Sequence, residues 1–121
     1  TGPYIQYSCA RIASILRKFG PYSESVKEDF IIETYTEWAL CLKLASFPSV
    51  VKSALEQRSP APIAQYALET ARLFTTFYHE CPVLDAAAPS QRMSRAQICA
   101  AVKTVIGNAL GLLGIETVER M

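Results

Sequence analysis

The sequence has little of what active sites and metal centres are usually built from. Its 121 residues hold one histidine and four cysteines, with no CxxC pair, no glycine-rich phosphate loop and no nucleophile motif. Structural zinc needs closely spaced Cys or His ligands, and a phosphate loop needs clustered glycines. We therefore expect no metal site, no bound cofactor and no catalytic residue within these 121 residues.

Long apolar runs and a strong charge of one sign are also absent. The longest uncharged apolar run, residues 104–115, is far shorter than the roughly 20 residues that cross a bilayer, so we expect no membrane partner. A net charge of +1 argues against indiscriminate binding of polyanions, so any recognition of nucleic acid must be local. A length of 121 residues predicts one domain over 1–121, and half of the residues are apolar, enough to bury a core. Because the chain begins with Thr1 and has no secretory signal, we expect a fragment of a longer protein.

The cysteines are read as buried, reduced thiols. Cys9, Cys41, Cys81 and Cys99 lie far apart, each within or at the end of a helical apolar pattern. Reduced core thiols indicate a cytoplasmic location. His79 and Cys81 are the one tempting catalytic pair, and a free-standing Cys–His hydrolase is the enzyme alternative. Their i, i+2 spacing on a predicted helix points the two side chains to different faces, which argues against it.

Hydrophobic periodicity predicts an all-α bundle of about five helices and no strand. Gly20-Pro21 ends the first helix, and Pro82 closes the fourth. Residues 22–28 and 83–89 are expected to be loops. The helices are expected up to Phe19, from about Asp29 to near Ser46, from Phe47 to about Gln57, from about Ile63 to Cys81, and from a cap at Ser90 to a stop near Gly114.

Each long predicted helix has an apolar side. In the second helix Glu33 and Glu37 fall on the opposite, polar side. The apolar positions are Ile5, Cys9, Ile12, Leu16 and Phe19 in the first helix; Ile31, Tyr35, Trp38 and Leu42 in the second; Ile63, Ala67, Ala71, Phe74, Phe77 or Tyr78, and Cys81 in the fourth; and Ile98, Val102, Val105, Ala109 and Leu112 in the last.

The outer side of the first helix is aromatic and basic, with Tyr4, Tyr7, Arg11, Ser14 and Lys18 at helical spacing. Two interpretations fit this side. Bases splayed out from an RNA loop are typically stacked on Tyr or Arg planes and hydrogen-bonded at their edges. Alternatively, the tyrosines pack against neighbouring helices and Arg11 forms a surface pair. The pattern alone favours the second interpretation and does not establish RNA binding.

Several motifs occur in order along nearly the whole chain: GPYIQYSCAR at 2–11, FYHECPVL at 77–84, RMSR at 92–95, LLGI at 112–115 and VERM at 118–121. Together they resemble the C-terminal anticodon-binding domain, or DALR domain, of arginyl-tRNA synthetases. They favour the arginyl enzymes over the cysteinyl and glycyl enzymes that share this domain type. The resemblance implies a helical bundle that cradles an anticodon loop.

The resemblance also implies roles for particular residues. Tyr7, Arg11 and Met121 match positions near the middle anticodon base, a cytosine in arginine tRNAs. Tyr7 would stack on the flipped base, Arg11 would donate to its acceptor edge, and Met121 would form an adaptable apolar wall. The remaining residues implied at the RNA interface are Tyr4, Tyr78, Cys81, Asp85, Arg92, Arg95 and Arg120.

Two of those residues have a second interpretation. Arg92 and Arg95 open a helix, where cations are unfavourable to the helix dipole, so each should have an anionic partner. That partner could be an RNA phosphate or an intramolecular glutamate. Arg120, near the terminus, could likewise serve either purpose.

The function implied by the resemblance is recognition of a tRNA anticodon loop within a monomeric arginyl-tRNA synthetase. In that enzyme a catalytic domain on the same chain attaches arginine to its tRNA and handles ATP and Mg. The HIGH-like signature of the ATP site is absent here, so these 121 residues alone should be inactive. The alternative is a helical module for protein interaction or domain docking, without RNA specificity.

Overall fold

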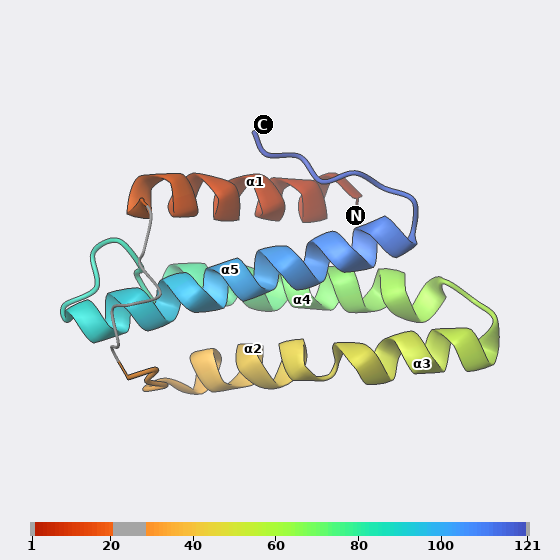
Figure 1. The fold of residues 1–121 in the computed structure, drawn as a ribbon, viewed down its shortest axis with the longest axis horizontal. Coiled ribbons are helices and arrows are strands. Elements are labelled where there is room, and N and C mark those ends of the chain that lie inside the picture. The colour runs from red at the N-terminus through yellow and green to blue at the C-terminus, as the bar shows by residue number, and fades with distance from the viewer. Residues whose placement is uncertain (1, 21–28, 121) are drawn as a thin grey trace.

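The computed structural model describes residues 2–20 and 29–120, and this part of the chain is helical with no strand. The all-α prediction is therefore confirmed. The helices α4 and α5 form a central pair, with α1 on one side and α2 and α3 on the other (Figure 1). Within the described residues the helices are α1 (Gly2–Phe19), α2 (Tyr35–Ala45), α3 (Phe47–Gln57), α4 (Ala61–Glu80) and α5 (Pro89–Leu112).

The α1 helix packs as its sequence predicts. Ile5, Cys9 and Ile12 are buried against α4 and α5, and Leu16 and Phe19 pack at the edge of the same core. The helix ends at Gly20, whose φ of +83° lies in the left-handed region that glycine tolerates best. One face of α1 is thus fixed inward, and its opposite face is left to the surface.

The α2 helix begins at Tyr35, later than the predicted start at about Asp29. Thr34 is its N-cap, and the Thr34 side chain accepts a hydrogen bond from the Glu37 N–H. The Ile31 N–H donates instead to the Ser94 hydroxyl of α5, at 3.0 Å. The backbone before Thr34 is therefore engaged with another helix and does not continue α2. The predicted loop at 22–28 lies outside the described residues.

The buried side of α2 is not the apolar side predicted from its sequence. Tyr35, Trp38 and Leu42 are 83%, 51% and 53% exposed, whereas Leu40 and Glu37 are 0% and 1% exposed. A glutamate is rarely buried unless a partner compensates its charge. Glu37 has such a partner on α5, described below, and this pairing turns the helix away from its expected orientation.

The other helices differ from their predictions in smaller ways. α5 begins at Pro89 after the N-cap residue Ala88, not after a cap at Ser90. Near its end Leu110 is buried, whereas the predicted core residue Leu112 is 59% exposed. In α4, Phe77 rather than Tyr78 lies in the core. α3 has its predicted bounds.

The end of α5 confirms the predicted stop near Gly114. Gly114 has a φ of +76°. Its N–H donates to the Gly111 carbonyl at 3.0 Å, and the Ile115 N–H donates to the Leu110 carbonyl at 2.8 Å. This pair of bonds is the Schellman arrangement, which satisfies two of the last helical carbonyls and turns the chain away from the helix axis. The chain then runs back over α1 (Figure 1).

In the described part of the chain, no single helix is long and apolar enough to cross a membrane. The bent pair α2–α3 passes that test only by its combined length and composition.

Candidate functional site

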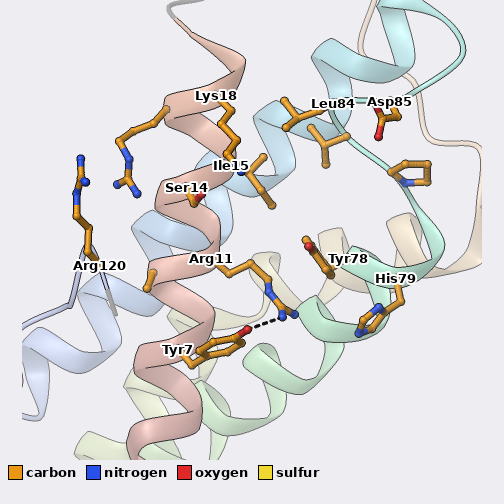
Figure 2. Close-up of a pocket in the computed structure, with 14 residues that line it drawn as sticks. Tyr7, Arg11, Ser14, Ile15, Lys18, Tyr78, His79, Leu84, Asp85 and Arg120 are labelled. Atoms are coloured by element: carbon orange, nitrogen blue, oxygen red, sulfur yellow. Dashed lines mark hydrogen bonds between the residues drawn. The ribbon is translucent and has the colours of Figure 1, made fainter.

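A pocket of about 690 Å³ opens beside the outer face of α1. Its walls come from α1, the end of α4, the loop at 82–85 and the C-terminal tail (Figure 2). It is lined by Tyr7, Ala10, Arg11, Ser14, Ile15, Arg17, Lys18, Tyr78, His79, Pro82, Val83, Leu84, Asp85 and Arg120.

Arg11 lies at the centre of this pocket, against two tyrosine rings. Its guanidinium carbon is 4.1 Å from the centre of the Tyr78 ring and 4.7 Å from that of Tyr7. One guanidinium N–H donates to the Tyr7 hydroxyl at 2.8 Å (Figure 2). Tyr7 and Arg11 are four residues apart, so α1 places them on one face, while Tyr78 comes from the last turn of α4. The result is a cationic group stacked on aromatic faces.

Neighbouring side chains fix the Tyr78 ring. It contacts His79 edge-on, with ring centres 5.3 Å apart, and packs near Phe74 at 6.4 Å. Phe74 is fully buried, which connects the pocket floor to the core. Tyr4, one turn before Tyr7, is tied to α4 through a 2.7 Å hydrogen bond with the Thr75 hydroxyl. These contacts hold α1 and α4 in register at the site.

The pocket lining is strongly basic, although the chain as a whole is nearly neutral. Arg11, Arg17, Lys18 and Arg120 line it, and Asp85 is the acidic residue among the lining side chains. The sequence as a whole has a net charge of only +1. Positive charge around a concave surface attracts anionic ligands and so raises their local concentration.

The C-terminal tail is fastened to α1 and brings Arg120 to the pocket. The Gln6 side-chain amide donates to the Glu116 carbonyl at 2.7 Å and accepts from the Val118 N–H at 2.9 Å. Arg17 donates to the Glu119 carbonyl at 3.3 Å. Since Gln6 satisfies two backbone groups of the tail, it sets the path of the chain beside α1.

The structure brings together half of the residues that the sequence pointed to. Tyr4 lies beside the pocket, bonded to α4. Met121 lies outside the described residues. The predicted site residues that line the pocket are Tyr7, Arg11, Tyr78, Asp85 and Arg120.

Three predicted site residues lie elsewhere. Cys81 is fully buried, with its sulfur 3.4 Å from the Thr34 hydroxyl. Arg95 is buried beside Glu37, so of the two anionic partners that the sequence left open, an RNA phosphate or an intramolecular glutamate, the structure places a glutamate next to it. The Arg92 guanidinium packs over the Phe19 ring at 4.5 Å. The side chains of Cys81 and Arg95 lie in the interior of the bundle, and neither lines the pocket.

Arg17, Lys18 and His79 line the pocket but were not among the residues predicted at the RNA interface, although the sequence placed Lys18 on the basic face of the first helix and considered His79 only as part of a catalytic pair. Lys18 lies two turns beyond Arg11 on the same face of α1, so its spacing carried the signal. His79 is exposed beside Tyr78, and that position depends on where α4 ends. Arg17 lines the pocket next to the C-terminal tail, and no sequence pattern within α1 predicts this position.

The thiols do not form a nucleophilic site. Burial raises the pKa of Cys9, Cys41 and Cys99, that of Cys99 to about 12, and a reactive cysteine needs a lowered pKa. Cys81 is buried whereas His79 is exposed, so the Cys–His pair of the enzyme alternative is not assembled. No cluster of three or more His, Cys, Asp and Glu side chains suited to a metal ion occurs among residues 2–20 and 29–120.

The bundle, with an aromatic and basic pocket between its first helix, its fourth helix and its tail, is an all-helical domain with a candidate binding site for an anionic ligand. Sequence comparison identifies the family. The chain belongs to the DALR anticodon binding domain family, whose sequence profile matches residues 5–121.

Individual relatives agree with this assignment. The arginine–tRNA ligases of Pseudomonas aeruginosa and Pseudomonas fluorescens are each 36% identical over 121 residues, which is 100% of this chain and 21% of theirs. The arginyl-tRNA synthetase of Thermus thermophilus superposes with a TM-score of 0.91 at 36% identity. That of Plasmodium falciparum superposes with a TM-score of 0.87 at 29% identity. Each superposition covers 100% of this chain and 21% of the other. The chain therefore spans about a fifth of the length of these relatives.

Proposed function

We propose that this chain binds the anticodon loop of an arginine tRNA, as one part of a longer arginyl-tRNA synthetase. The observation that carries the proposal is the position of Arg11, which is stacked against Tyr7 and Tyr78 inside a basic pocket. Proteins that read RNA loops take splayed bases onto aromatic or guanidinium planes and hydrogen-bond their edges. Arg11 and the two tyrosines provide both kinds of surface.

Base recognition would combine stacking with hydrogen bonds from Arg11. A guanidinium has five N–H donors, and the Tyr7 hydroxyl accepts one of them here. A cytosine presents its O2 and N3 as acceptors on its pairing edge, which suits a planar group with several parallel donors. The resemblance also implies an apolar wall at Met121, and the proposal keeps that role.

The RNA backbone would lie along the basic rim. Arg17, Lys18 and Arg120 lie in the pocket wall beside Arg11, where phosphates flanking an inserted base would pass. Phosphate contacts contribute much of the binding strength and make it fall with increasing salt. They would hold the loop in place, whereas discrimination between bases would depend on Arg11.

In the whole enzyme, a catalytic domain on the same chain would join arginine to the tRNA with ATP and Mg. The relatives that match this chain are about five times longer, which leaves room for such a domain. We propose that the enzyme acts as a monomer in the cytoplasm. The 121 residues described here would supply tRNA docking and identity, and they would not aminoacylate alone.

The substitution Arg11→Ala tests the proposal. Binding of a fluorescent anticodon stem-loop of an arginine tRNA, measured by anisotropy at one fixed salt concentration, should weaken by roughly 1–3 kcal/mol, since a base-reading arginine is lost. The preference for cytosine over other middle bases should shrink with it. Arg72→Ala is the matched control, because Arg72 is exposed on α4 and does not line the pocket.

Other outcomes would count against base reading. If Arg11→Ala weakened the binding of all stem-loops equally, Arg11 would be a phosphate contact. If the variant bound like Arg72→Ala, the pocket would not receive the loop.

A docking module is the second candidate, favoured by the exposed face of α2. Tyr35, Trp38 and Leu42 are each at least half exposed there, across the α4–α5 pair from α1 (Figure 1). Large exposed apolar side chains at helical spacing are typical of protein contacts. Arg11→Ala separates the two functions, because docking through α2 would be unchanged by it.

A further inference from the structure

Next to Pro82 of the pocket wall lies a group of four polar side chains, Thr34, Glu37, Cys81 and Arg95, here called the Arg95 cluster; Thr34 is half-buried and the other three are buried. Arg95 and Glu37 are 7% and 1% exposed, and Cys81 is fully buried. The cluster joins the start of α2, the end of α4 and the first turns of α5. It adjoins the 82–85 loop, which forms one wall of the pocket.

Arg95 holds two groups with one guanidinium. Its Nη1 donates to the Pro82 carbonyl at 2.9 Å, and its Nη2 donates to the Glu37 carboxylate at 3.4 Å. The third nitrogen, Nε, is buried and has no hydrogen-bond partner among the described residues. A buried ion pair with an unsatisfied donor is a poor source of stability, because desolvation offsets the attraction. We therefore expect Arg95 to matter mainly because it positions the Pro82 carbonyl and the Glu37 carboxylate.

Glu37 is oriented from the opposite side by the helix cap. The Thr34 hydroxyl donates to the Glu37 carboxylate at 3.0 Å and accepts from the Glu37 N–H at 3.1 Å. Because the single hydroxyl proton is used for Glu37, the Cys81 thiol is left to donate to Thr34 at their 3.4 Å contact. The cluster is thus a chain of contacts from the α2 cap to the Pro82 carbonyl.

The 82–85 loop is anchored in the core by Val83, which is 6% exposed, but its backbone is weakly hydrogen-bonded. Just after the loop, the Ala86 N–H reaches the Val83 carbonyl at a long 3.4 Å, and Pro82 has no N–H to donate. Pro82 is the first residue after the C-cap of α4, Cys81, and Arg95 holds its carbonyl by a hydrogen bond. The residues that follow, Leu84 and Asp85, line the pocket across from Arg11 (Figure 2).

We infer that Arg95 is a positioning residue for base discrimination, which it controls without touching the RNA by fixing the 82–85 loop. This inference rests on the proposed function, because it assigns a task to the wall of the same pocket. It replaces the direct RNA contact that the sequence motif implies for Arg95. A lysine cannot take over the role, since one ammonium group lacks the planar fork that spans two acceptors.

The test compares Arg95→Lys with Val102→Ala. Val102 is a fully buried core residue two turns further along the same helix, so its truncation costs stability and leaves all four side chains of the cluster unaltered. Two quantities are measured for each variant: amide hydrogen exchange of a peptide covering 81–88, and the ratio of affinities for anticodon stem-loops that carry cytosine or another middle base. Exchange is measured well below the melting temperature of either variant.

In Arg95→Lys we expect exchange in 81–88 to be faster by about tenfold, and the affinity ratio to fall by a similar factor, because a hydrogen bond to a charged group is lost. Val102→Ala should change neither. If Arg95→Lys does not fold, Glu37→Gln, which keeps the shape of the cluster but removes the carboxylate, should accelerate exchange in the same peptide.

Unchanged exchange and an unchanged affinity ratio in a folded Arg95→Lys protein would overturn the inference. The inference would also be overturned if Val102→Ala changed the exchange rate and the affinity ratio as much as Arg95→Lys does. Arg95 would then act only by stabilising the fold as a whole. If the unaltered protein showed no base preference at all, the proposed function would be wrong. Faster exchange confined to Arg95→Lys would then still establish that Arg95 positions the loop, and unchanged exchange would refute that as well.

Discussion

At the residue scale, the guanidinium of Arg11 is held in place by its neighbours in the pocket. Two tyrosine rings and one hydroxyl hold its guanidinium, so this long side chain has already lost much of its freedom. Immobilising a side chain of this kind during association costs about 0.5–1.5 kcal/mol. A ligand that meets Arg11 in this position avoids part of that cost. Under the proposed function, the two tyrosines would therefore contribute to recognition even where they do not contact the RNA.

Cys99 should make the folded chain less stable at alkaline pH. Burial raises the pKa of its thiol from 9.0 to about 12. Below pH 9 the thiol is protonated in both the folded and the unfolded chain, whereas above pH 9 the unfolded chain releases the proton first. The free energy of unfolding should therefore fall as the pH rises, with Cys99 contributing a loss of about 1 kcal/mol by pH 10. Urea unfolding at pH 7, 8, 9 and 10 measures this fall.

Cys99→Ala is the control for that experiment. It removes the titrating thiol, so its stability should decline less steeply between pH 8 and pH 10 than that of the unaltered protein. Cys9 and Cys41 also have raised pKa values and contribute in the same direction, so some decline should remain. An equally steep decline in Cys99→Ala would contradict the assignment.

At the scale of a helix, α1 was predictable and α2 was not, for a physical reason. The buried face of α1 consists of apolar side chains at regular spacing, and such a face needs only some apolar neighbour. The orientation of α2 depends on a specific partner, because Glu37 is paired with Arg95, 58 residues further along the chain. No local pattern reports that pairing, so the spacing of Tyr35 and Trp38 gave the wrong face.

The end of α5 predicts opposite effects for two similar substitutions. Gly111 lies within the helix, and a Cβ there would meet nothing within 4 Å. Gly111→Ala should therefore raise the free energy of unfolding by roughly 0.5 kcal/mol, since alanine loses less entropy in a helix. Gly114 has a φ of +76°, so Gly114→Ala should lower the free energy by about 1 kcal/mol. Urea unfolding of both variants measures the two changes. If both substitutions changed the free energy of unfolding in the same direction, the explanation by backbone conformation would be contradicted.

At the scale of the whole molecule, the site is assembled from parts that lie far apart in the sequence. Gln6 of α1 binds the tail at Glu116, 110 residues away, and Tyr78 reaches Arg11 from the end of α4. Helical periodicity could place Tyr7 and Arg11 on one outer face, and resemblance to a family could add Tyr78 and Arg120. The lining by Arg17 and His79 depends on the path of the tail and on the end of α4, which only the packed structure determines.

The distribution of charge is likewise a property of the folded molecule. The sequence has a net charge of +1, yet folding gathers Arg11, Arg17, Lys18 and Arg120 around one pocket. A nearly neutral chain with this arrangement would bind RNA locally, as proposed, without being a general polyanion binder. It also implies that the affinity will decrease with salt, so affinities must be compared at one salt concentration.

The most direct measurement of the central claim is a titration of the unaltered chain with two anticodon stem-loops at one moderate salt concentration. One is the stem-loop of an arginine tRNA, and the other differs only in its middle base. Because Arg11, Tyr7 and Tyr78 form the wall that would read this base, we predict binding to the first and a loss of roughly tenfold or more for the second. Equal binding to both, or binding to neither, would contradict the claim that this pocket reads the anticodon.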